Sequence, residues 1–282
     1  MMSDLELLLK ESIVKSSALG GGCIAYTGYL LTESGRELVV KKNSTTQMAI
    51  KEANGLNELR KSGVIRIPEV VHADEQLLIL EFIREGSRPG SFFSDFGRQL
   101  AQLHKYSSGA YGFYEDNYIG STPQLNRPEG EEKSNWATYY FNKRLLYQYE
   151  LAEKNGFVDR TFKDLFRHLE SCLPDILKGS EEAPSLLHGD LWGGNFIVGT
   201  DGVPVLIDPA VYYGHREAEL AMTHLFGGFD HLFYEAYNAE WPLKPGYQQR
   251  EAVYTLYHVL NHLNIFGTSY RSQALALMQQ YG

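Results

Sequence analysis

The stretch His188-Gly189-Asp190-Leu191-Trp192-Gly193-Gly194-Asn195, followed by Asp208-Pro209 after the next predicted strand pair, decides the fold. Phosphoryl transfer to a hydroxyl needs a carboxylate that accepts or orients the proton of the acceptor. It also needs hard oxygen ligands that hold Mg²⁺ against the nucleotide phosphates. Asp190 fits the catalytic base, and Asn195 and Asp208 fit the metal ligands. The same Asp-to-Asn interval, with a later metal-binding Asp, is typical of kinase catalytic loops.

The N-terminal region is expected to supply the other half of such a site. Gly21 and Gly22 open a predicted hairpin, where the backbone can approach phosphates without side-chain obstruction. A predicted strand over 37–41 ends in Lys41, and Glu52 lies in the next predicted helix. A Lys41–Glu52 ion pair would aim the ammonium group at the nucleotide phosphates. The glycines alone are a weak signal, because neither a G-x-G-x-x-G nor a P-loop spacing is present.

The strand predicted over 77–83 ends where the chain crosses between two lobes. Its backbone at Glu81 and Ile83 is expected to hydrogen-bond the edge of an adenine ring. Lys42 and Lys51 lie close to the predicted ion pair in sequence, and they are interpreted as solvated surface charges.

Apolar periodicity and turn residues predict the elements around these motifs. In the first lobe we expect a helix over 5–13, a loop over 16–22, strands over 23–32, 37–41, 69–73 and 77–83, and a helix over 46–61. After a linker over 86–90 we expect a helix over 92–106, a long loop over 107–133, helices over 135–154 and 159–178, short strands over 185–188, 196–198 and 203–207, and a mostly helical C-terminal third. The predicted fold is α+β with two lobes, over residues 1–87 and 88–282.

Length and composition agree with a two-lobed enzyme. The 282 residues correspond to about two domains. A net charge of −9 disfavours nucleic acids and anionic membranes as partners. Two cysteines, Cys23 and Cys172, cannot build a disulfide framework and favour a reducing compartment. No apolar run has transmembrane length, and the charged N-terminus is unlike a signal peptide, so a cytoplasmic protein is expected.

The order of these features resembles the protein-kinase-like fold. The residues within the motifs resemble one branch of it, the fructosamine (ketosamine-3-) kinases. The stretches that carry the likeness are Gly21 to Ile24, Val40 to Asn43, Glu52 to Leu56, Asp116 to Gln124 (DNYIGSTPQ), His188 to Asn195 and Asp208 to Met222 (DPAVYYGHREAELAM). The last three are long and specific. The resemblance spans about residues 18–270, and Arg127-Pro128 is a departure that is expected to alter the acceptor rim.

The resemblance implies ATP- and Mg²⁺-dependent phosphorylation of the 3-hydroxyl of a ketosamine, the rearranged product of a sugar and an amine. The 3-phosphate then decomposes, which implies a role in deglycation. It also implies Asp190 as catalytic base, Asn195 and Asp208 as Mg²⁺ ligands, Lys41 as phosphate ligand and Glu52 as its partner. The acceptor would be a small-molecule or protein-bound ketoamine, and the protein a monomer or homodimer.

The acceptor side of the site is expected to include the polar, aromatic loop that begins at Asp116 and Asn117. Trp192, inside the catalytic loop, is expected to stack on the apolar face of a sugar. Two other functions stay open. An aminoglycoside- or choline-type phosphotransferase would share the loop architecture, and a nucleotide-binding pseudokinase would regulate a partner. A chain freed from catalysis has no chemical need for the full set of five polar residues, which argues against the pseudokinase.

The remaining polar residues are interpreted mainly as structural. His188 is expected to brace the catalytic loop. The segment His215 to Glu219 opens a predicted helix, where we expect Arg216 to pair locally. His258 and His262 share one helix face, and a packed core is favoured over a zinc pair.

Cys23 lies beside the predicted glycine turn, where backbone N–H groups would stabilise a thiolate. Oxidation there, or an intermolecular disulfide, would block the nucleotide site. This redox switch is a hypothesis with an equally simple alternative, a small strand residue.

Overall fold

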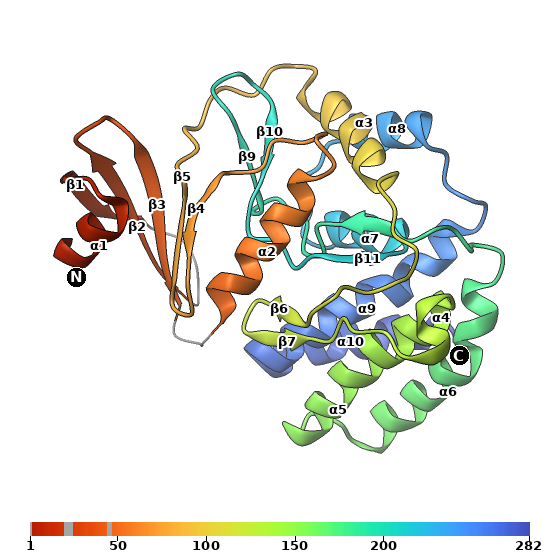
Figure 1. The fold of residues 1–282 in the computed structure, drawn as a ribbon. Coiled ribbons are helices and arrows are strands. Elements are labelled where there is room, and N and C mark those ends of the chain that lie inside the picture. Colours follow the sequence, from red (N-terminus) through yellow and green to blue (C-terminus); the bar gives the residue numbers. More distant parts are fainter. Residues whose placement is uncertain (1, 20–24, 44–46) are drawn as a thin grey trace.

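The computed structural model describes residues 2–19, 25–43 and 47–282. Its N-terminal part is a five-stranded antiparallel sheet in the order β1-β2-β3-β5-β4, with one helix on each face (Figure 1). The elements are α1 (Met2–Leu9), β1 (Ile13–Ala18), β2 (Ala25–Thr32), β3 (Glu37–Asn43), α2 (Met48–Arg60), β4 (Val70–Ala73) and β5 (Leu77–Glu81). The predicted sheet and its helix over 46–61 are confirmed, and β5 ends two residues before the predicted strand does.

Side-chain alternation along β3 decides where Lys41 points. Leu38 and Val40 are buried in a small cluster that α1 covers through Leu5 and Leu9. Successive residues of a strand face opposite sides. Lys41 therefore lies on the other face, toward α2. On that face the sheet contributes Leu78 and Leu80 to the main core, where α2 contributes Ala49, Ala53, Leu56 and Leu59.

The start of the chain differs from the prediction. The expected helix over 5–13 is shorter, because α1 ends at Leu9 and Lys10 adopts a φ of 55°. Part of the expected loop is the edge strand β1, which pairs with β2. Ile13 and Val14 are β-branched and favour extended backbone. Helical spacing of the leucines before them concealed that preference.

The rest of the chain is mostly helical, and α9 runs through its centre (Figure 1). The helices are α3 (Phe92–His104), a 3₁₀ turn (Gly130–Lys133), α4 (Trp136–Tyr140), a π-helical segment (Phe141–Leu146), α5 (Tyr147–Lys154), α6 (Arg160–Leu177), α7 (Arg216–Leu225), α8 (His231–Glu240), α9 (Tyr247–Phe266), a second 3₁₀ turn (Thr268–Tyr270) and α10 (Arg271–Gln279). Three two-stranded pairs complete it: β6 (Asn117–Ile119) with β7 (Thr122–Gln124), β9 (Phe196–Val198) with β10 (Pro204–Leu206), and β8 (Ser185–Leu187) with β11 (Tyr212–Gly214).

Three details of this region were not predicted. The long loop over 107–133 contains the β6–β7 hairpin and a 3₁₀ turn, and β11 was not expected at all. The missed strands have three residues each and include polar residues, proline or glycine, whereas β9, which was predicted, is a continuous apolar run. The helix predicted over 135–154 is interrupted by the π-helical segment, in which Arg144 is buried.

The sheet and the helical part meet around α2, which lies between them in Figure 1. The chain passes from β5 to α3 through an extended segment in which Glu85 pairs with Gly199 of the other part. The boundary at residue 88 stays a prediction. Among the described residues, no helix is both long enough and apolar enough to cross a bilayer.

Candidate active site

The turn between β8 and β9 holds Asp190 and Asn195 together. The Asn195 amide donates to the Asp190 backbone carbonyl at 2.7 Å and to its carboxylate at 3.2 Å. The backbone carbonyl of Asn195 accepts the backbone N–H of Ile207, and this bond joins the turn to the end of β10. Within the described part of the chain, no donor is recorded for the Asn195 side-chain oxygen. That oxygen is therefore available to a cation.

The Asp190 carboxyl has a strongly perturbed pKa. Burial raises it, and the negative charge of Asp208 adds to this effect, whereas the hydrogen bond from Asn195 acts in the opposite direction. The resulting pKa is about 8. A general base works best when its pKa lies near the operating pH. Positive charge bound nearby would lower the pKa of Asp190 from this raised value toward neutrality.

Lys41 connects the sheet with the other side of the site. Its ammonium group donates to Glu52 Oε1 at 2.7 Å, which confirms the predicted ion pair, and it also contacts the Asp208 carboxylate. Burial lowers the pKa of Lys41, but the two carboxylates outweigh burial and the net shift is upward. Asp208 follows β10 with a φ of 55°, a left-handed conformation that Asp tolerates better than most residues. The ion pair and the second predicted metal ligand therefore form one contiguous group.

The donor set fits Mg²⁺. Asn195 offers an amide oxygen, and the Asp208 carboxylate is 48 % exposed on the open side of the turn. Mg²⁺ in nucleotide sites takes one or two protein carboxylates and completes its shell with phosphate oxygens and water. Among the described residues, no group of three or more His, Cys, Asp or Glu side chains could hold a metal alone.

His258 and His262 are packed on the helix, as favoured in the sequence analysis. His258 is buried, and the imidazole of His262 donates to the backbone carbonyl of His258 at 2.8 Å.

Glu219 of α7 supports the turn between β8 and β9, residues 188–195, which we call the catalytic turn. Its carboxylate accepts the backbone N–H groups of His188 at 2.9 Å and Gly189 at 2.7 Å, and it also bonds His104 Nε2 at 3.0 Å. His104 Nδ1 in turn meets the Tyr237 hydroxyl at 2.7 Å. Burial raises the pKa of Glu219, but the hydrogen bond and charge interaction with His104 outweigh it, so the net shift is downward. An ionised carboxylate thus fixes the backbone that precedes Asp190.

His188 braces the turn, as predicted. Its Nε2 donates to the Ile207 carbonyl at 2.8 Å, and its Nδ1 accepts the Asp190 backbone N–H at 3.3 Å. Burial lowers the pKa of the imidazole, which favours the neutral form. Gly189 has a φ of +86°, and a Cβ there would lie 2.0 Å from the Ala210 carbonyl oxygen. Only glycine fits at this position, where the chain after β8 passes the segment before β11.

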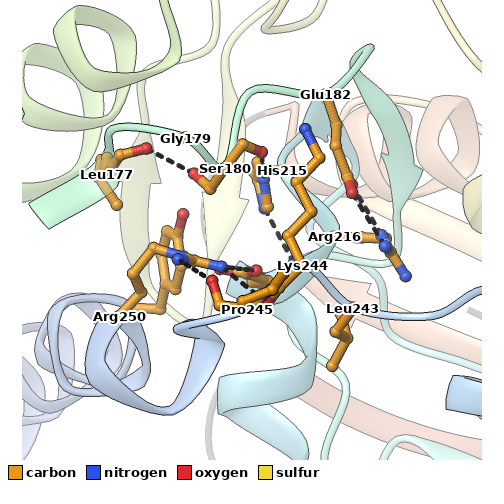
Figure 2. A network of polar contacts seen from close by, with 12 residues as sticks. Leu177, Gly179, Ser180, Glu182, His215, Arg216, Leu243, Lys244, Pro245 and Arg250 are labelled. Carbon is orange, nitrogen blue, oxygen red and sulfur yellow. Dashed lines mark hydrogen bonds and ion pairs between the residues drawn. The ribbon is translucent and has the colours of Figure 1, made fainter.

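The first turn of α7 forms long-range contacts, so the expected local pairing of Arg216 is wrong. Arg216 binds Glu182 with two hydrogen bonds of 2.7 and 2.9 Å (Figure 2). Glu217 binds Arg250 of α9 in the same bidentate manner, at 2.7 and 2.6 Å. Arg216 also donates to the backbone carbonyls of Trp241 and Pro242. These contacts tie the segment that holds Glu219 to the loops around Glu182 and Trp241 and to α9.

Asp116 and Asn117 shape the acceptor-side loop. Asp116 accepts the backbone N–H of Asn126 at 2.7 Å and that of Arg127 at 3.2 Å. Asn117 is buried; its amide nitrogen donates to Val211, and its oxygen accepts from Gln124 and Asn126. The structure therefore places both side chains within the fold of the loop. Direct contact with an acceptor stays a prediction for them.

Trp192 lies on the catalytic turn, and 39 % of it is exposed. Its ring meets Phe226 edge-on, with centroids 6.1 Å apart. It covers Gly194 so closely that a Cβ at Gly194 would lie 2.3 Å from the indole ring. The backbone of the turn thus sets the orientation of this exposed aromatic face beside Asp190.

The nucleotide side is described in part. The Glu81 side chain binds Arg66 at 2.7 Å, and its backbone N–H pairs with Glu69. Contact of the Glu81 backbone with adenine stays a prediction. The backbone N–H of Ile83 has no recorded backbone partner in the described portion of the chain, which suits an adenine contact. The predictions for Gly21, Gly22 and Cys23 lie outside the described residues.

Lys51 and Glu115 were not recognised from sequence. Lys51 is not a solvated charge, because its ammonium group binds the Glu115 carboxylate at 2.6 Å and only 18 % of its side chain is exposed. The two residues are far apart in sequence and share no motif. No signal short of the fold itself could have paired them.

Comparisons with known proteins find relatives along almost the whole chain. The family model described as fructosamine kinase matches residues 4–281. The chain is 39% identical to a chloroplastic protein-ribulosamine 3-kinase of Oryza sativa subsp. indica, covering 94% of this chain and 78% of the relative. It is 33% identical to the ketosamine-3-kinase of Mus musculus, covering 98% and 99%.

Solved structures show the same fold. A "putative fructosamine-3-kinase" of Thermobifida fusca superimposes with a TM-score of 0.88 and 29% identity, covering 100% of this chain and 98% of that one. A type I macrolide 2'-phosphotransferase superimposes with a TM-score of 0.63 at 14% identity, covering 98% and 94%, which shows the kinase-like fold alone. With the family model and relatives above 30% identity both spanning nearly the whole sequence, the chain belongs to the fructosamine kinase family.

Proposed function

We propose that this protein transfers the γ-phosphoryl group of ATP to the 3-hydroxyl of a ketosamine. The observation that carries the proposal is the assembly of Lys41, Glu52, Asp190, Asn195 and Asp208 at one site. Family membership and the names of the relatives in rice and mouse support an ATP-dependent ketosamine kinase. The identification of Mg²⁺ as the metal and of the individual residue roles is part of the proposal.

Each side chain has a distinct part in the transfer. Asp190 accepts a hydrogen bond from the acceptor hydroxyl and takes its proton as the oxygen attacks the γ-phosphorus. The bond from that phosphorus to the β–γ bridging oxygen breaks, and ADP leaves. Lys41, oriented by Glu52, binds the nucleotide phosphates. Asn195 and Asp208 hold Mg²⁺, which would neutralise charge that develops on the phosphate oxygens. Because little covalent chemistry falls to the protein, catalysis rests on positioning and electrostatics.

Exchange of the contact between Lys41 and Asp208 accompanies nucleotide binding in this proposal. The Lys41 ammonium group contacts the carboxylates of both Glu52 and Asp208. Bound phosphates would bring negative charge to Lys41, and the Asp208 carboxylate would then be free to hold the metal. The exposed side of Asp208 gives room for this change.

The acceptor lies on the side of Asp190 that Trp192 borders. The exposed indole face offers an apolar surface for the carbon face of a sugar. Asp116 and Asn117 support that side by holding the loop over 116–127 in place. Adenine would bind along the backbone at Glu81 and Ile83, with Gly21 and Gly22 over the phosphates. We further propose that the acceptor is a small-molecule or protein-bound ketoamine and that the reaction serves deglycation. The protein would be cytoplasmic and either a monomer or a homodimer.

A coupled assay of Mg²⁺-dependent ATP consumption tests the acceptor. The panel consists of fructose-lysine, ribulose-lysine, an aminoglycoside and choline. Turnover with a ketosamine supports the proposal. Turnover with the aminoglycoside or choline alone would keep the phosphotransfer site and overturn the acceptor, whereas no turnover on any acceptor would favour a pseudokinase.

A further inference from the structure

Helix α2 carries Glu52, so its position decides where Lys41 points. We propose that Glu115, on the loop before β6, is a positioning residue that holds α2 against the helical lobe and thereby keeps the Lys41–Glu52 pair assembled. The inference rests on the proposed phosphotransfer function. It assigns to a residue outside the catalytic turn the task of fixing the phosphate-binding lysine.

The contacts of Glu115 are divided between two side chains of α2. Its Oε2 atom binds Lys51 Nζ at 2.6 Å, and its Oε1 atom accepts the Asn54 amide at 2.8 Å. Lys51 and Asn54 are three residues apart and therefore lie on one face of the helix. They flank Glu52 in sequence. Glu115 is only 8 % exposed, so the pair is shielded from solvent and from screening by salt.

Two further contacts dock the same helix on the segment that follows Asp208. Gly55 packs so closely against Val211 that an added Cβ would lie 3.2 Å from its Cγ2 atom. Farther along α2, the Tyr213 hydroxyl donates to Glu58 at 2.8 Å. In Figure 1, α2 accordingly runs between the sheet and the helical lobe. Glu115 supplies the charged contact of this interface.

The physical consequence follows from the chain of contacts. Glu115 fixes the turn of α2 that contains Glu52, Glu52 orients Lys41, and Lys41 reaches Asp208. Without the carboxylate, Lys51 loses its partner at a shielded site, and that turn of α2 is free to move outward. Displacement of a positioning group by about 1 Å can reduce a rate by about 10²-fold.

The test compares Glu115→Gln with a matched control. Glu132 resembles Glu115 because it is 6 % exposed and binds one lysine, Lys143, and one asparagine amide, from Asn142, away from α2. It also accepts the backbone N–H of Glu129 at 2.8 Å. We expect Glu115→Gln to lower kcat/KM for ATP about tenfold and to weaken Mg²⁺–ATP binding in calorimetry. Glu132→Gln should change neither by more than about twofold, although both variants lose a similar contact.

A double-mutant cycle separates positioning from a general structural role. If Glu115 acts through Glu52, adding Glu115→Gln to Glu52→Gln should reduce kcat/KM for ATP by less than about twofold further. An equal loss in both backgrounds would overturn the proposal, as would a Glu115→Gln enzyme with the activity of Glu132→Gln.

If Glu115→Gln does not fold, Lys51→Gln takes its place in the same cycle, with the same expected and contradicting results. Calorimetric binding of Mg²⁺–ATP requires no acceptor. An incorrect ketosamine assignment would therefore abolish turnover in the wild type while leaving this binding comparison intact.

Discussion

Substitution of Glu219 by Gln perturbs the support of the catalytic turn without touching substrate. The Glu219 carboxylate accepts three hydrogen bonds, two from the backbone N–H groups of His188 and Gly189 and one from His104. A glutamine of the same shape offers one oxygen and one NH₂ group. In either orientation of the amide, at least one buried donor loses its acceptor and faces another donor.

The expected cost follows from that count. A hydrogen bond to a charged group contributes about 1.5–3 kcal/mol, so losing one or two of these bonds destabilises the protein by about 3 kcal/mol. For a chain of this size, each kcal/mol lowers the melting temperature by roughly 2–4 °C. We therefore expect a decrease of about 10 °C for Glu219→Gln. Because Asp190 follows the two supported peptides, kcat should also fall about tenfold.

Differential scanning calorimetry and steady-state kinetics measure both effects. The control is Tyr237→Phe, which removes the far hydrogen bond to His104 and the interaction of the hydroxyl with Arg216 but leaves the Glu219 carboxylate in place. It should cost about 1 kcal/mol with little change in kcat. A Glu219→Gln enzyme with wild-type melting temperature would refute the reasoning. So would a destabilised enzyme that retained full kcat, because the carboxylate would then not position the turn.

Three further predictions concern the base, the aromatic face and pH. Asp190→Asn should lower kcat by about 10²–10⁴-fold, with nucleotide affinity in calorimetry largely kept; retained turnover would exclude this base. Gly194→Ala, whose Cβ would lie 2.3 Å from the Trp192 ring, should raise the acceptor KM and leave the ATP KM unchanged. Burial lowers the pKa of His258 to about 3. Protonation of the unfolded imidazole, near pKa 6.5, should therefore remove about 2 kcal/mol of stability between pH 7 and 5. In denaturant unfolding, the free energy of unfolding of His258→Phe should fall between pH 7 and 5 by that amount less than in the wild type. An unchanged pH dependence would contradict this prediction.

The motifs were predictable because their information is local. Asp190 and Asn195 lie on one turn, and Lys41 ends a strand whose alternation is visible in the sequence. Their convergence on Asp208 was predictable as well, because the order of the elements resembles a known fold.

Contacts between distant segments were not predictable from a single sequence. Glu115 meets Lys51, and Arg216 meets Glu182, only because the fold brings separate loops and helices together. Lys51 was interpreted as a solvated surface charge and Arg216 as locally paired, since nothing in a sequence window reports burial. The strand β1 was missed for a different reason, because its short β-branched start directly follows leucines at helical spacing.

Location of the transferred phosphate tests the central claim most directly. The protein, Mg²⁺, ATP and fructose-lysine or ribulose-lysine are followed by phosphorus NMR. The account predicts a phosphate ester coupled to the proton on carbon 3 of the sugar, formed by the wild type and absent with Asp190→Asn. A phosphate on another hydroxyl, or inorganic phosphate released at the same rate without the ketosamine, would contradict it.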